Sequence, residues 1–159
     1  MTHLWEDNIK SFLRLASQQN IKLIMVGGGA VNFHGYQRHS ADVDFWISTT
    51  DENLEKLKTV FKAMGYELEA FPDTVKKGEQ NISVKFSPND LTLELITRFA
   101  ISKSFDEAYQ AAELVTLDET PVLRWRVLSY NDLIESKKRA ARPKDILDIQ
   151  QLQKLNTKH

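Results

Sequence analysis

The sequence contains no cysteine, and this absence excludes disulfide bonds, zinc sites with thiolate ligands and cysteine nucleophiles. It also lacks any apolar run near the roughly 20 residues that a helix needs to span a bilayer. The first ten residues carry acidic side chains where a signal peptide would be basic. These absences lead us to expect a cytoplasmic protein with no membrane partner.

Neither sign of charge dominates, because 21 Lys and Arg residues stand against 22 Asp and Glu residues and give a formal net charge of −1. No overall attraction to nucleic acid or to membranes is therefore expected, although a local basic patch is not excluded. With 159 residues, of which 42% are hydrophobic, the chain is expected to form a single domain, 1–159.

Apolar side chains recur with the periods of both helices and strands. This pattern predicts an α/β (α+β) fold, with a short mixed β-sheet flanked by helices at about 20–128 and a helical C-terminal segment at about 129–156. We expect strands at 21–26, 42–48, 66–71, 81–87, 91–97 and 121–129. We expect helices at 3–18, at 29–35, from the cap pair Thr49 and Glu52 to Gly65, and at 130–141. A last helix is expected from Pro143, with an apolar stripe of Ile146, Ile149, Leu152 and Leu155. The segment 104–113 is either a helix or an irregular crossing.

Two aspartates interrupt the apolar strand pattern ADVDFWI at 41–47. On a strand, Asp42 and Asp44 project from the same face, about 7 Å apart. Carboxylates this close repel each other, and a divalent cation would remove the repulsion. Glu94 interrupts the apolar run at 91–97 in the same way and would join the pair if the two strands are neighbours. The alternative is a solvated edge strand, or carboxylates that pair with basic side chains.

Three glycines, Gly27, Gly28 and Gly29, follow the first apolar strand and precede a short helix. Glycine lets the backbone approach a ligand closely, and free amides at the start of a helix attract phosphate oxygens. The stretch fits neither a P-loop nor a dinucleotide-binding fingerprint. A glycine triplet alone is usually only a turn, but the acidic pair downstream favours a site for phosphoryl or nucleotidyl transfer.

These residues together resemble the signature of the DNA polymerase beta nucleotidyltransferase superfamily. In that signature an apolar residue and two small residues precede an Asp-x-Asp pair with apolar neighbours. Here Val26, Gly27 and Gly28 are followed, after thirteen residues, by Asp42 and Asp44. A third acidic residue lies on a later strand, as in the superfamily.

Two further segments resemble the small bacterial and archaeal members of this superfamily, including the abortive-infection (type IV) toxin group. Arg38 and Ser40 lead into the aspartates as in the motif Arg-x-Ser/Thr-x-Asp-x-Asp. The segment 132–152 resembles a helical Lys…Arg-Pro-x-Asp-x-x-Asp run, in which Lys137 is the lysine and Arg142 the arginine.

The resemblance implies an enzyme that transfers a nucleoside monophosphate from a nucleoside triphosphate to an acceptor hydroxyl and releases pyrophosphate. It implies that Asp42, Asp44 and Glu94 are the catalytic acids and bind Mg²⁺ or Mn²⁺. Gly27 and Gly28 would bring amides to the β and γ phosphates. The resemblance and the basic residues of the sequence add four side chains to the expected nucleotide site, namely Arg38, Ser40, Lys137 and Arg142.

The acceptor class stays open, with RNA such as a tRNA end, a protein hydroxyl and a small molecule as candidates. A toxin-like member would also have a cognate antitoxin as its partner. The second functional hypothesis is a catalytically inactive module that binds a nucleotide or a partner and keeps the fold. Glu94 discriminates between the two, because catalysis requires its carboxylate near those of Asp42 and Asp44.

A basic cluster stands out near the C-terminus, made of Lys137, Lys138, Arg139, Arg142 and Lys144. It is either a solvated helix face or a phosphate-binding surface. Lys138 and Arg142 would share a face if the helix continues that far. We expect Asp145 and Asp148 to pair with these bases rather than to bind metal.

Three other side chains near the glycines and aspartates have alternative roles. Arg38 either contacts a phosphate or steadies the start of the strand. His34 is expected to have a loop or capping role. The tryptophans are expected either in the core or as base-stacking surfaces, and Trp46, which falls on the same strand face as the aspartates, is the better candidate for contact with substrate.

Overall fold

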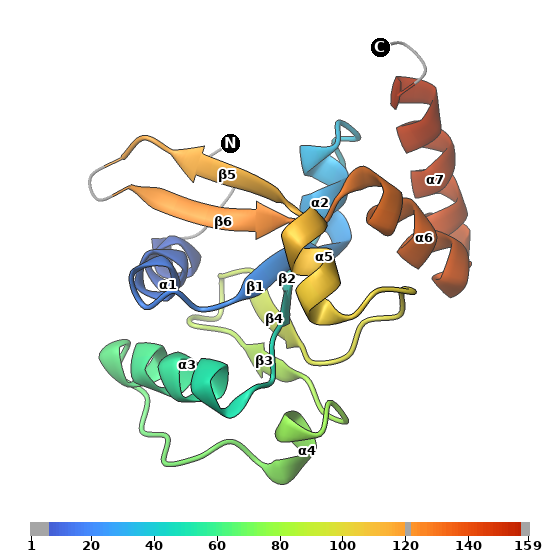
Figure 1. Cartoon of the computed structure of the whole chain (residues 1–159). Helices are drawn as coiled ribbons and strands as arrows, with labels where there is room; N and C mark the ends of the chain where they lie inside the picture. The colour runs from blue at the N-terminus through green and yellow to red at the C-terminus, as the bar shows by residue number, and fades with distance from the viewer. Residues whose placement is uncertain (1–6, 120–121, 157–159) are drawn as a thin grey trace.

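The computed structural model describes residues 7–119 and 122–156 (Figure 1). A six-stranded sheet in the order β3-β4-β2-β1-β6-β5 forms its centre, and helices flank the sheet. The strands are β1 (Leu23–Val26), β2 (Asp42–Ile47), β3 (Ile82–Val84), β4 (Thr92–Ile96), β5 (Glu113–Leu117) and β6 (Leu123–Val127). The helices are α1 (Asp7–Gln18), α2 (Gly27–Phe33), α3 (Asp51–Ala63), α4 (Asp73–Lys76), α5 (Phe105–Ala111), α6 (Tyr130–Ala140) and α7 (Pro143–Asn156). The expected α/β class with a mixed sheet is confirmed.

The strands that carry the acidic residues are neighbours in the sheet. β2 runs parallel to β4, with Asp44 opposite Glu94. β1 runs antiparallel to β2, with Val26 opposite Asp44. β1 and β6 are parallel, whereas β3 pairs with β4 and β5 with β6 in antiparallel fashion. This register brings the turn after β1 next to the carboxylates of β2 and β4.

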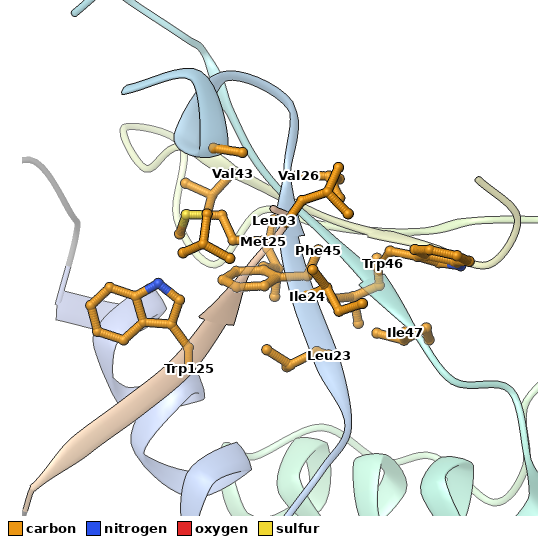
Figure 2. Packing of buried hydrophobic residues seen from close by; sticks show 14 of the residues in the cluster. Leu23, Ile24, Met25, Val26, Val43, Phe45, Trp46, Ile47, Leu93 and Trp125 are labelled. Carbon is orange, nitrogen blue, oxygen red and sulfur yellow. The ribbon is translucent and has the colours of Figure 1, made fainter. Parts of the chain in front are cut away.

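The two central strands are buried where they meet (Figure 2). All four residues of β1 are buried, as expected for an apolar run with structure on both faces. On β2, Val43 and Phe45 enter the core from the face opposite the aspartates. Helix α1 packs against α3, where the rings of Phe12 and Phe61 lie 5.7 Å apart between centroids. The burial of this apolar surface, at about 25 cal/mol per Å², holds the sheet that carries the site.

Helix α3 begins one residue later than the sequence pattern predicts. Thr50, not Thr49, is the N-cap, and its hydroxyl accepts a hydrogen bond from the amide of Asn53. The predicted pair of Thr49 and Glu52 is therefore wrong. The helix ends as expected before Gly65, which has a φ of +96°.

The expected strand at 66–71 does not form. Its aromatic side chains instead cover the end of α3, where the rings of Tyr66 and Phe71 lie 6.1 and 6.4 Å from that of Phe61. Conversely, β5 was not expected, because it is an edge strand with mostly exposed or partly exposed side chains and lacks a clear apolar alternation. The short helix α4 was also missed within a polar stretch.

The helical C-terminal segment is present as two helices that lie side by side at the edge of the molecule, away from α1 and α3 (Figure 1). Ala141 separates them in the left-handed conformation, with a φ of +49°. The helix thus ends before Arg142, so the condition for a shared helix face of Lys138 and Arg142 is not met. No helix in the described part of the chain is both long and apolar enough to cross a membrane.

The buried face of α7 differs from the expected apolar stripe at its first turn. Ile146 is 44% exposed, whereas Ile149 and Leu152 are buried as expected. The positions that continue this buried face toward the start of the helix are Asp145 and Asp148, which are 0% and 1% exposed. Two buried carboxylates therefore face the rest of the protein from α7.

Candidate active site

Three carboxylates from two strands line one cleft. Asp42 and Asp44 project from β2, and Glu94 projects from β4 directly opposite Asp44. The strands that carry these residues, β2 and β4, are therefore neighbours, which is the condition that the sequence left open. The cleft has a volume of about 380 Å³ and opens to solvent, and Gly27 and Gly28 also line it.

The negative charges of Asp42 and Glu94 act on the carboxyl group of Asp44. Burial is the main reason that the pKa of Asp44 rises from 3.8 to about 6, and the nearby Asp42 and Glu94 carboxylates raise it further. Lys137 and Lys144 act in the opposite direction and lower the pKa of Asp44. The cleft therefore holds excess negative charge close to Asp44, and a cation placed there would be stabilised.

The glycine turn, made of Gly27 and Gly28 where β1 passes into α2, touches the acidic strand so closely that side chains do not fit. Gly27 has a φ of +61°, and a Cβ added to it would collide with Oδ2 of Asp44. A Cβ on Gly28 would lie 2.8 Å from the Cβ of Ser40. Glycine is thus required by backbone conformation and by contact at the first position, and by contact at the second.

A group of charged side chains, of which Lys137, Asp145 and Asp148 are buried, forms another wall of the cleft. The Nζ atom of Lys137 lies 3.2 Å from Asp145 and 3.0 Å from Asp148, and the lysine is only 5% exposed. Arg38 donates two hydrogen bonds to Asp148, at 2.9 and 3.0 Å. Arg142 donates to Asp145 through Nε at 2.6 Å. The expectation that Asp145 and Asp148 pair with bases is confirmed.

These contacts also shift the pKa values of Asp145 and Arg142. Burial alone would raise the pKa of Asp145, but hydrogen bonds from Arg142 and Lys137 outweigh it and lower the pKa. The same contact raises the pKa of Arg142. With three cationic side chains and two carboxylates, this wall has a formal excess of positive charge.

Sequence comparison now identifies the family. The model of the family described as nucleotidyltransferase of unknown function (DUF6036) matches residues 7–157, nearly the whole chain. The chain belongs to this family. No curated protein sequence matches it.

A solved structure has a similar fold. ANT(2″)-Ia, in complex with adenylyl-2″-tobramycin, superposes with a TM-score of 0.51 over 91% of this nucleotidyltransferase and 85% of the other chain. The two sequences are 15% identical, so this likeness shows the fold alone.

The donor atoms in the cleft of this nucleotidyltransferase suit a hard divalent cation. Three carboxylates supply oxygen ligands, which Mg²⁺ and Mn²⁺ prefer. In the described residues, however, no three Asp, Glu or His side chains are arranged to hold a metal ion as they stand. Oε1 of Glu94 instead accepts a hydrogen bond of 2.5 Å from the hydroxyl of Ser83. This contact uses one of the two carboxylate oxygens of Glu94 and leaves the other as a ligand for a cation shared with Asp42 and Asp44.

The remaining candidate side chains have structural contacts. The hydroxyl of Ser40 donates to the carbonyl of Asp42 at 2.8 Å, which steadies the start of β2. His34 contacts the carbonyl of Leu128 at 2.7 Å through Nε2. Trp46 is only 5% exposed, and its ring packs against other aromatic rings of the core, so the expected substrate contact is wrong.

Sequence reasoning missed several residues that line the cleft. Lys144 is the most informative, since it is exposed and lies near enough to Asp44 to lower its pKa. Its position in the basic cluster was the signal that could have found it. The others are Asn81, Ile96, Phe99, Ser136 and Ala140, and no motif marks them.

Proposed function

We propose that residues 1–159 form one nucleotidyltransferase domain that transfers a nucleoside monophosphate from a nucleoside triphosphate to an acceptor hydroxyl with the help of a divalent metal. One observation carries this proposal: three carboxylates from neighbouring strands converge beside a glycine turn and face a basic wall. Membership of a nucleotidyltransferase family supports it.

In this proposal the acidic side of the cleft binds metal. Asp42, Asp44 and Glu94 hold Mg²⁺ or Mn²⁺, and Glu94 also takes the proton of the acceptor hydroxyl. When bound, the metal supplies stabilisation of the attacking and leaving oxygens. The raised pKa of Asp44 supports this role, because a divalent cation would relieve the repulsion that burial makes costly.

The basic side of the cleft and the glycine turn bind the triphosphate. Gly27 and Gly28 admit it because neither has a side chain in the space next to Asp44 and Ser40. Arg142 and Lys144 are exposed at the cleft and contact phosphate oxygens. Lys137 is buried and attracts the phosphates electrostatically without touching them. Arg38, which is held by Asp148, and Ser40, which is held by the backbone, fix the shape of the loop beside the triphosphate.

The acceptor is RNA such as a tRNA end, a protein or a small molecule. A small-molecule acceptor gains support from the similar fold of ANT(2″)-Ia, whose structure holds tobramycin with an adenylyl group attached. A toxin-like role, with a cognate antitoxin as partner, is carried by the motif resemblance of Arg38, Ser40 and the aspartates.

A label-transfer experiment tests this function. The protein is incubated with Mg²⁺ or Mn²⁺ and one α-labelled triphosphate at a time, together with total cell RNA, lysate protein or a panel of aminoglycosides. Label should appear in one acceptor class. Asp44→Asn should reduce transfer about a hundredfold or more, because it removes a metal ligand worth several kcal/mol. Glu113→Gln, on the edge strand β5, is the matched control and should transfer normally.

The hydrogen bond between Ser83 and Glu94 favours a second candidate, an inactive module that keeps the fold. If this bond keeps Glu94 away from Asp42 and Asp44 when nucleotide binds, the three carboxylates cannot share a metal ion. The module would then bind triphosphate without transferring label to any fraction. Nucleotide binding together with no transfer would favour this candidate over catalysis.

A further inference from the structure

One hydroxyl group lies where the proposed reaction needs its acceptor. Ser83 is exposed on the edge strand β3, directly opposite Glu94 on β4. Its Oγ donates a hydrogen bond to Oε1 of Glu94. Glu94 is the carboxylate proposed to accept a proton from the attacking hydroxyl, so a hydroxyl of the chain itself already occupies the partner position.

The strand register places this hydroxyl on the correct side of the phosphates. Ser83, Glu94, Asp44 and Val26 are successive partners on β3, β4, β2 and β1 and form a row across the sheet. Neighbouring strands are about 4.8 Å apart, so the backbones of Ser83 and Asp44 are separated by about 10 Å. Ser83 therefore lies at one end of the row, and the glycine turn that follows Val26 lies at the other. A triphosphate whose tail reaches the glycines directs its leaving group away from Ser83.

Ser83 lies beside the cleft through its contact with Glu94, whereas the two serine hydroxyls that line the cleft are already committed to the backbone. Ser40 donates to the carbonyl of Asp42 and Ser136 donates to the carbonyl of Leu133. Ser83 differs because its hydrogen bond ends on a carboxylate that can take up the proton.

We propose that Ser83 is a self-acceptor, and that the chain transfers a nucleoside monophosphate to its own Ser83; this inference rests on the proposed function. Oγ of Ser83 forms a bond to the α-phosphorus of the triphosphate. The bond from that phosphorus to the oxygen bridging to the β phosphate breaks, and pyrophosphate leaves with the electron pair. The hydroxyl proton passes to Glu94. The product is a phosphodiester between Ser83 and the nucleoside.

Mass spectrometry of the intact chain and of its tryptic peptides tests the proposal. The protein is incubated with Mg²⁺ or Mn²⁺ and each nucleoside triphosphate, without an external acceptor. One nucleoside monophosphate should be added to the peptide 78–85, which contains Ser83 as its only hydroxyl-bearing residue. The rate constant should not change on dilution, because the reaction occurs within one chain. Ser83→Ala should lose this adduct, and Ser83→Thr should retain it.

Ser87→Ala is the matched control, since Ser87 lies in the turn after β3 and its carbonyl accepts the amide hydrogen bond of Asp90. This variant should acquire the adduct as the parent does. An adduct on another residue, or its persistence in Ser83→Ala, would overturn the proposal.

The label-transfer experiment separates this failure from failure of the proposed function. Transfer to an external acceptor by a parent chain that never modifies Ser83 would reject self-modification and leave the function standing. If Ser83→Ala then loses external transfer, Ser83 only positions Glu94. If neither the chain nor any acceptor is labelled, both proposals fail.

Discussion

Arg38 and Asp148, which are 110 positions apart in the sequence, form a two-pronged ion pair with distances of 2.9 and 3.0 Å. Asp148 is 1% exposed and also forms an ion pair with Lys137, whose Nζ lies 3.0 Å from the carboxylate. The pair ties helix α7 to the loop that leads into the acidic strand. The C-terminal helices are thus built into the wall of the candidate active site.

Removal of this shared carboxylate should destabilise the protein. Asp148→Asn leaves Arg38 without its buried carboxylate and Lys137 with Asp145 as its remaining one, and we expect a loss of about 3–5 kcal/mol in the free energy of unfolding. Urea denaturation measures it. The control Glu52→Gln removes an exposed partner of Lys56 and should leave the unfolding midpoint unchanged. Equal effects of the two variants would show that the buried group does not hold α7.

Stability should depend on pH through Asp44. Its pKa is raised from 3.8 to about 6, so the folded chain holds a proton that the unfolded chain releases. The resulting stabilisation is fully present below pH 3.8 and is lost as the pH rises through 6. In EDTA, Asp44→Asn should gain about 2 kcal/mol relative to the parent between pH 4 and 7, after allowance for solvent screening. Denaturation curves across this range measure the difference, and a constant difference would contradict the raised pKa.

Two glycine substitutions separate backbone strain from a collision at the site. Gly27→Ala and Gly65→Ala both place alanine at positive φ, which costs about 1–2 kcal/mol. Only at Gly27 does the new methyl group meet Asp44, whereas Gly65 has open space around it. We therefore expect calorimetry to show loss of Mg²⁺–triphosphate binding in Gly27→Ala alone. Normal binding by Gly27→Ala would remove the turn from the proposed site.

Lys144 should matter for binding but not for folding. It is exposed at the cleft, so Lys144→Ala should raise the KM for the triphosphate about tenfold through loss of a charged contact, with little change in Tm. Lys138→Ala, which alters an exposed lysine outside this cleft, is the control. A matching rise in KM for both variants would indicate a general charge effect.

The site was predictable where its signals are local. The alternation of Asp42 and Asp44 with apolar residues shows a shared strand face, and Glu94 repeats that pattern on β4. The glycine turn was recognisable because Gly27 and Gly28 directly follow a buried strand. These positions are close in sequence to the elements that orient them, so periodicity alone places their side chains.

The other parts of the fold and the site depend on contacts between distant residues, which the periodicity of the sequence does not encode. The pairing of Arg38 with Asp148 and the hydrogen bond of Ser83 to Glu94 follow from how distant elements pack and from strand register. The aromatic residues at 66–71 have strand propensity, but the end of α3 offers them a ring cluster instead. Tertiary packing overrides local preference at each of these places.

The most direct measurement of the central claim is an anomalous diffraction map of crystals soaked with Mn²⁺ and a non-hydrolysable triphosphate. We predict a manganese peak bounded by the carboxylates of Asp42, Asp44 and Glu94, with the triphosphate tail against Gly27. Glu94→Gln, soaked in the same way, should weaken the peak. A triphosphate bound elsewhere, or bound in this cleft with no manganese between the three carboxylates, would contradict it.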